Sequence, residues 1–172
     1  WALFFGRLER YKGIDLLLRA QTILRRGGAN IGLTLAGPGQ LDQVWDQDLP
    51  AGVDLRDRLI HDQEALDLFR RCGVVVLPYR DATQSALVAA AYYFHKPVIV
   101  TDVGALPEYV ASGRTGWIVP PEDPASLADC LAAAFSDPQR LAAMGEQGRA
   151  WYDRQRLAEW ITLTAMVDRL AR

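Results

Sequence analysis

Short apolar runs alternate with amphipathic stretches along most of the chain. The apolar runs predict strands at residues 2–5, 31–36, weakly within 53–60, and at 74–77, 98–100 and 116–119. The run from Val74 to Leu77 is apolar at every position, which is typical of a central strand covered by helices on both faces. Strands and helices that alternate in this way predict repeated βα units on a parallel sheet.

Helical patterns fill the intervals between these runs. One helical stripe carries Ile14, Leu17, Leu18 and Leu24, and a second begins with Ala65, Leu66 and Phe69. A helix over residues 85–94 must end before Pro97. After residues 120–121 the pattern predicts helices alone, at 124–135, 138–148 and about 151–170. We therefore expect one α/β domain over residues 1–172, with three layers, about six mostly parallel strands, helices on both faces and a helical carboxyl terminus.

Composition narrows the class of protein. The chain has 172 residues, half of them hydrophobic, which is enough for one domain with its own core. Its net charge is −2 and neither sign forms a long block, which argues against nucleic acid or an anionic membrane as a partner. No apolar run approaches the roughly 20 residues that span a bilayer, and nothing resembles a signal peptide. Because the chain starts at Trp1 without a methionine, we expect a fragment of a longer protein.

The spacing of the two cysteines indicates the cellular compartment of the protein. Cys72 and Cys130 lie far apart in apolar helical surroundings, without metal-type spacing, so we expect buried free thiols in a reducing compartment, with a disulfide as the alternative. This favours a cytoplasmic protein. A domain of the longer protein outside this chain could in addition attach such a cytoplasmic protein to the surface of a membrane.

The turn at residues 6–13 follows the first strand and carries Arg7 and Lys12. A turn between a strand and a helix is where α/β proteins bind phosphate, and these two cations suit a diphosphate. Lysine occurs elsewhere only at Lys96, which favours a function for Lys12. The alternative is that both side chains are solvated or form ion pairs with Glu9 and Asp15.

Residues 79–87 follow the central strand. Thr83 or Ser85 can cap the next helix, whose N–H groups would then add an uncharged anion site; ordinary capping without a ligand is the alternative. Gly37-Pro38-Gly39 forms a tight turn but lacks the third glycine of a dinucleotide fingerprint. Neither histidine has the partners of a catalytic triad or a metal site. We expect His61 in a helix-entry loop and His95 in a left-handed helix stop.

Four motifs, at residues 6–13, 35–39, 96–108 and 113–121, occur in an order and spacing that hold over residues 3 to 150. Together they resemble the carboxyl-terminal domain of retaining GT-B glycosyltransferases of the glycosyl transferases group 1 type. The resemblance implies a Rossmann-like domain that binds a nucleotide-sugar donor, while a missing amino-terminal domain holds the acceptor. It also implies sugar transfer with retention, and neither a metal nor a further cofactor.

The same resemblance assigns site residues. Arg7 and Lys12 would contact the donor diphosphate, helped by the backbone amides around Ser85, Ala86 and Leu87. Further candidate donor contacts are Gly6, Gly37 and Gln84. No catalytic residue is assigned. The closing helix with Trp151, Tyr152 and Trp160 would cross back onto the missing domain, or else pack within this one.

One departure from the family pattern matters. The family usually carries two glutamates eight positions apart, and these positions hold Ala82 and Ala90 here. The inner glutamate normally holds the ribose and the outer one contacts the sugar, so Gln84 is a hypothetical substitute. Our leading hypothesis is a donor-binding domain that is inactive without its missing partner. The alternatives are a degenerate domain with an assembly or regulatory role and, more weakly, an epimerase of GT-B type or a nicotinamide-dependent protein.

Overall fold

The computed structural model describes residues 1–83 and 85–170. Six strands form one parallel sheet in the order β3-β2-β1-β4-β5-β6. The strands are β1 (Ala2–Phe5), β2 (Leu33–Ala36), β3 (Val53–Arg56), β4 (Val74–Leu77), β5 (Val98–Thr101) and β6 (Gly116–Val119). The helices are α1 (Ile14–Arg26), α2 (Asp62–Arg71), α3 (Ala86–Tyr93), α4 (Pro124–Ser136) and α5 (Pro138–Leu170), with single 3-10 turns at η1 (Arg10–Lys12), η2 (Leu41–Gln43) and η3 (Leu106–Tyr109).

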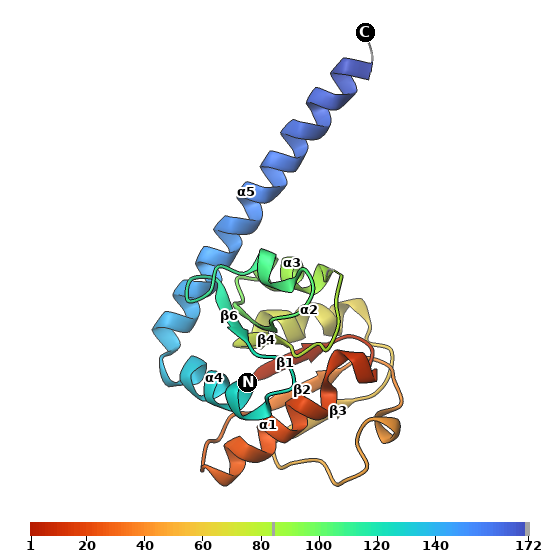
Figure 1. The fold of residues 1–172 in the computed structure, drawn as a ribbon, viewed down its shortest axis with the longest axis vertical. Helices are drawn as coiled ribbons and strands as arrows, with labels where there is room; N and C mark the ends of the chain where they lie inside the picture. Colours follow the sequence, from red (N-terminus) through yellow and green to blue (C-terminus); the bar gives the residue numbers. More distant parts are fainter. Residues whose placement is uncertain (84, 171–172) are drawn as a thin grey trace.

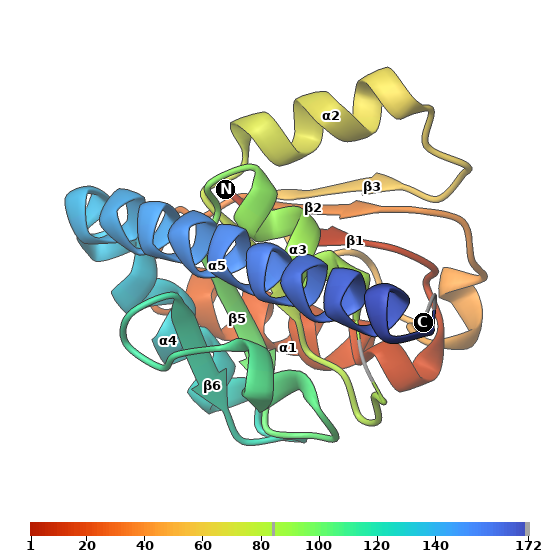
Figure 2. The same ribbon diagram turned by 90° about the horizontal axis from the view of Figure 1, so that it is seen from above.

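Helices cover both faces of the sheet, as the apolar strands require. Figure 2 shows α1 and α4 on one face and α2 and α3 on the other. The central strands β1 and β4 are buried almost completely, and side chains from both helical layers join them in one core. The predicted Rossmann-like three-layer fold is therefore confirmed, with every strand within three residues of its expected limits except the weak third one, which ends at Arg56.

The carboxyl-terminal region differs from the prediction. Instead of two helices separated after Gly148, α5 is continuous from Pro138 to Leu170. Its glycines permit close packing and do not end the helix: a Cβ at Gly145 would lie 2.0 Å from the His95 carbonyl oxygen, and one at Gly148 would lie 2.4 Å from the Tyr92 ring. Read from sequence alone, a glycine at a helix contact looks like a helix terminus.

The first part of α5 packs on the domain and the rest projects beyond it (Figure 1). The Trp151 ring lies edge-on to Tyr92, at 5.6 Å between centroids, and Tyr152 lies edge-on to Tyr93. Further along, Trp160 is 67% exposed, with Leu157 and Ile161 also exposed. Of the two alternatives expected for the closing helix, packing within this domain is thus confirmed for Trp151 and Tyr152. Throughout the described residues, every helix is too short or too polar to cross a membrane.

Two smaller predictions are confirmed. His95 has a left-handed φ of 56° at the stop after α3, and its Nδ1 lies 2.9 Å from a Glu146 carboxylate oxygen. Cys72 and Cys130 are free thiols; Cys72 is buried as expected, whereas Cys130 is only partly buried, and desolvation raises the pKa of each to about 12.

Candidate functional site

The loops at the carboxyl edge of β1, β2 and β4 meet where the strand order reverses, between β1 and β4. Gly37 packs so tightly on the first loop that a Cβ would lie 2.2 Å from the Gly6 carbonyl oxygen, and its φ of 141° also excludes other residues. Beside them, the Leu8 amide donates to the Pro38 carbonyl at 3.0 Å. Leu87 at the start of α3 lies 3.7 Å from the Cβ position of Gly6. The structure thus brings together the turn at residue 6, the turn at residue 37 and the start of α3.

Lys12 lies half-buried at the end of η1, beside the loop that leads from β4 to α3. Its ammonium sits 3.9 Å from the centre of the Tyr79 ring and 4.8 Å from that of Tyr11, a cation–π arrangement. Among the described residues no carboxylate pairs with it, so the alternative pairing with Asp15 is wrong. Lys12 is thus a partly desolvated cation without an anionic partner in the part of the chain that the structure describes.

Asp15 instead pairs with Arg80, which follows β4. The two groups form a bidentate contact, at 2.6 and 2.8 Å, and both are largely buried. Burial alone would raise the pKa of Asp15, but the Arg80 hydrogen bonds and charge outweigh it and lower that pKa. Arg80 also pairs with Glu122 after β6.

Arg80 fixes η1 as well. Its Nη1 donates to the Arg10 carbonyl at 2.8 Å, and its backbone amide donates to the Tyr11 carbonyl at 2.8 Å. A single side chain therefore ties together η1, the first turn of α1 and the loop after β6, and so positions Lys12. Sequence reasoning missed Arg80 because its partners are 42 to 70 residues away and form no local pattern.

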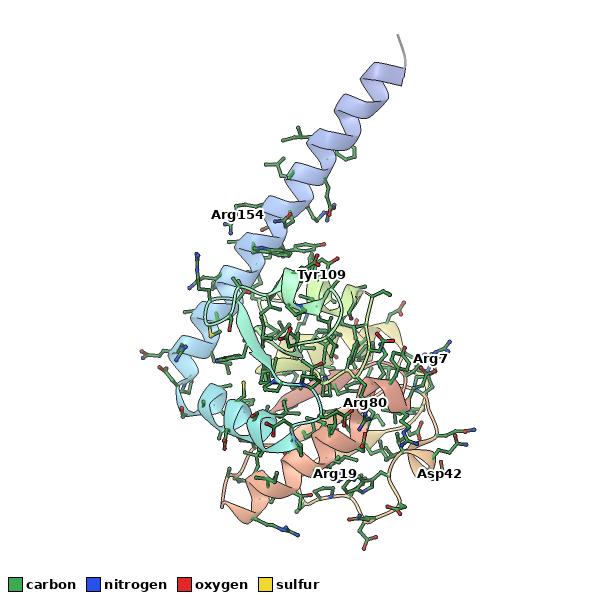
Figure 3. All side chains as sticks on the ribbon, in the orientation of Figure 1. Arg7, Arg19, Asp42, Arg80, Tyr109 and Arg154 are labelled. Atoms are coloured by element: carbon green, nitrogen blue, oxygen red, sulfur yellow. The ribbon has the colours of Figure 1, made fainter. Side chains whose placement is uncertain are left out.

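Arg7 lies at the rim of the site, and Figure 3 shows its side chain directed outward while Arg80 lies inside the loops. The Arg7 side chain is 74% exposed and its nearest carboxylate, on Glu9, is 3.6 Å away. It lines an open cavity of about 720 Å³ with Pro38, Gly39 and Gln43 of η2; Lys12 is not part of that lining. Without a ligand, Arg7 thus takes the expected alternative: its side chain is largely solvated and forms an exposed ion pair with Glu9.

The start of α3 has the predicted cap. The Ser85 hydroxyl accepts a hydrogen bond from the Leu87 amide at 3.3 Å, so of the two predicted caps it is Ser85. This occupies one of the three amides assigned to the diphosphate. Within the described part of the chain, nothing accepts from the amides of Ser85 and Ala86. Gln84, the suggested replacement for a family glutamate, lies outside the described residues.

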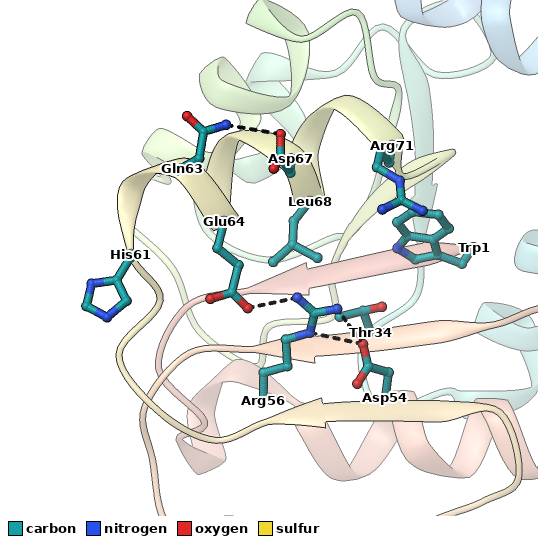
Figure 4. Close-up of a pocket in the computed structure, with 10 residues that line it drawn as sticks. All are labelled: Trp1, Thr34, Asp54, Arg56, His61, Gln63, Glu64, Asp67, Leu68 and Arg71. Atoms are coloured by element: carbon teal, nitrogen blue, oxygen red, sulfur yellow. Dashed lines mark hydrogen bonds and ion pairs between the residues drawn. The ribbon is translucent and has the colours of Figure 1, made fainter.

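A second charged cavity, of about 650 Å³, lies between α2 and the sheet (Figure 4). There Arg56 bridges Asp54 and Glu64, and Arg58 binds the same Glu64 carboxylate through two bonds of 2.8 Å. Hydrogen bonds from Arg58 and Arg56 lower the pKa of Glu64 to about 2. Because these charges already neutralise each other, this cavity is a weaker anion site than the junction around Lys12. His61 stands at its rim, immediately before α2, as expected.

Comparison with known proteins identifies the family to which this chain belongs. The family model described as glycosyl transferases group 1 matches residues 1–137. The chain belongs to this family. A D-inositol 3-phosphate glycosyltransferase from Arthrobacter sp. is 34% identical over 165 residues, covering 87% of this chain and 39% of the relative. The chain thus spans about two fifths of the length of that curated relative.

Solved structures agree in fold with this member of the group 1 family. Sucrose-phosphate synthase from Thermosynechococcus elongatus superposes with a TM-score of 0.78 at 23% identity, over 99% of this chain and 46% of that one. The Anabaena protein HepE, solved in complex with UDP, gives a TM-score of 0.77 at 19% identity, over 94% and 48% of the two chains. The likeness to these GT-B glycosyltransferases covers only part of each of them.

Proposed function

We propose that this chain is the donor-binding domain of a glycosyltransferase that transfers sugar from a nucleoside-diphosphate sugar with retention of configuration. The observation that carries the proposal is the half-buried Lys12 ammonium, which has no carboxylate partner among the described residues and lies over the ring of Tyr79, in the loop that leads from β4 to α3. Uncompensated positive charge beside open helix amides favours an anion. That HepE was solved with UDP supports a nucleotide as this anion.

Each cationic group then has a distinct role. Lys12, held by η1 and Arg80, presents a fixed charge, while the amides of Ser85 and Ala86 add hydrogen bonds along the α3 dipole. Arg7 is exposed and weakly paired, so it can fold over the ligand without breaking a strong contact. When the bond between sugar and diphosphate breaks, negative charge grows on the leaving phosphate, and these fixed groups stabilise it.

Ala82 and Ala90 leave ribose and sugar recognition unassigned. The Ala82 carbonyl oxygen already accepts a hydrogen bond from the Ala105 backbone amide, at 3.3 Å. Loss of both carboxylates had suggested a degenerate domain, but no comparison supports that alternative. The proposal has three further parts. An amino-terminal domain holds the acceptor, the fragment is inactive by itself, and the protein is cytoplasmic.

Calorimetric titration of this chain with UDP, GDP and ADP tests the proposal. We expect millimolar or tighter binding of at least one of them, since a single domain offers only part of the site. Lys12→Met and Arg7→Ala should each weaken that binding. Arg26→Ala removes an exposed charge at the last residue of α1, far from the candidate site, and should leave UDP binding unchanged. Equal binding by the parent chain and a double variant at Arg7 and Lys12 would exclude diphosphate binding through this pair.

A further inference from the structure

Tyr79 carries a polar group that the fold itself does not use. The residue follows β4, is only 1% exposed, and its hydroxyl oxygen is buried without a hydrogen bond to any described residue. Burial raises the pKa of Tyr79, and a hydrogen bond from the nearby Ser85 hydroxyl to the ionised phenol would oppose that rise; with both hydroxyls protonated, their distance and angle do not form a hydrogen bond. Leaving a buried hydroxyl unbonded is unfavourable by about 1–3 kcal/mol, so an unbonded hydroxyl calls for an explanation.

The surroundings of Tyr79 offer an explanation for the unbonded hydroxyl. Its ring lies under the Lys12 ammonium at 3.9 Å, and its hydroxyl lies beside Ser85 at the first turn of α3. The same side chain thus touches both halves of the candidate anion site. A phenol is protonated at neutral pH and burial raises its pKa further, so the Tyr79 hydroxyl can donate a hydrogen bond to an anion.

We propose that Tyr79 is a phosphate ligand of this site: its hydroxyl donates to a phosphate oxygen that Lys12 and the first amides of α3 also bind, and its ring face holds the Lys12 ammonium in position. The inference rests on the proposed function, because it names a further residue of the same site. It explains why the hydroxyl is unbonded, since its acceptor belongs to the ligand. Arg80, the next residue, fixes the strand end from which Tyr79 projects.

The test is Tyr79→Phe, which removes the hydroxyl and keeps the ring. We expect its affinity for UDP to fall about tenfold, the effect of losing one hydrogen bond to a charged group. Its melting temperature without ligand should not fall, because the Tyr79 hydroxyl forms no hydrogen bond with a described residue. A purely structural role for Tyr79 would leave UDP affinity unchanged.

Tyr92→Phe is the matched control. Tyr92 is also fully buried, but its hydroxyl contacts Thr115 Oγ1 at 2.8 Å and donates to the Tyr109 carbonyl at 3.0 Å. This variant should therefore melt at a lower temperature and bind UDP with unchanged affinity. The two phenylalanine variants are expected to show opposite patterns.

Lysine NMR gives a second readout, since Lys12 and Lys96 are the chain's two lysines. In ¹³C-lysine-labelled protein, the Lys12 side-chain signal should be shifted upfield mainly by the Tyr79 ring at 3.9 Å and less by the Tyr11 ring at 4.8 Å. It should keep that shift in Tyr79→Phe and lose most of it in Tyr79→Leu. UDP should move this signal and leave Lys96 in place.

The outcomes separate the two proposals. If Tyr79→Phe binds UDP as the parent does while Lys12→Met loses binding, the role of Tyr79 is overturned and the donor site stands. If the parent chain binds none of UDP, GDP and ADP at millimolar concentration, the donor site itself fails, and the Tyr79 proposal fails with it.

Discussion

Arg80→Met tests the idea that one side chain holds the phosphate-facing loops together. The substitution keeps a long apolar stem but removes the bidentate contact with Asp15, the ion pair with Glu122 and the hydrogen bond to the Arg10 carbonyl. The Asp15 carboxylate then stays largely buried, at 17% exposure, without its cation.

The expected loss follows from this burial. An exposed ion pair contributes at most about 1 kcal/mol, and removing one member of a fully buried pair costs about 3–5 kcal/mol. Arg80 and Asp15, at 23% and 17% side-chain exposure, lie between these limits, so we expect a loss of about 2–3 kcal/mol in the free energy of unfolding. For a chain of this size that lowers the melting temperature by about 5–10 °C.

Urea unfolding followed by circular dichroism measures this loss. Glu122→Gln serves as the matched control, because the Glu122 side chain is 58% exposed and its removal should cost less than about 1 kcal/mol. Arg80→Met should also weaken UDP binding, since η1 and Lys12 lose an anchor. An Arg80→Met chain as stable as Glu122→Gln would refute the reasoning.

The acid side of the stability curve gives a check on the same pair. Because the pKa of Asp15 is lowered in the folded state, its stabilisation is present above its ordinary value of 3.8 and is lost as pH falls through the lower folded value. Arg80→Met should remove this part of the acid dependence.

Three further results are expected. Since the pKa of Glu64 is lowered from 4.5 to about 2, Glu64→Gln should destabilise the chain at neutral pH and flatten its stability between those two values, measured by urea unfolding. Gly145→Ala should lower the melting temperature despite a helix-propensity gain of about 1 kcal/mol, because its Cβ meets the His95 carbonyl; an unchanged or higher temperature would contradict the packing of α5. Both cysteines, with pKa values of about 12, should resist iodoacetamide in the native chain and react in urea, as mass spectrometry would show.

The sequence predicts the layers of this fold well because strands covered on both faces must be continuously apolar. Val74 to Leu77 is the clearest case, and the structure buries it between helical layers. The capping role of Ser85 is also readable, since a cap depends on residues two or three positions away. Local chemistry of this kind leaves local signals.

Contacts between distant segments leave no such signal. The Arg80–Asp15 pair joins residues 65 positions apart, and nothing near either residue marks it. The position of Lys12 in a turn predicts a phosphate contact, but its cation–π contact with the Tyr79 ring depends on β1 and β4 being neighbours in the sheet. Gly145 and Gly148 misled the prediction of α5 because a glycine for close packing and a glycine for termination look alike in one sequence.

The adjacency of β1 and β4 also bears on the order in which the chain can fold. β1, α1 and β2 are consecutive and can pair as soon as they are made, but β1 gains its other neighbour only when residues 74–77 join it. The sheet is thus two half-sheets joined at one non-local seam, and seams of this kind form late and slowly. A ligand bound over the seam would fasten the halves together, so backbone amides of β1 and β4 should exchange with solvent more slowly when the site is filled.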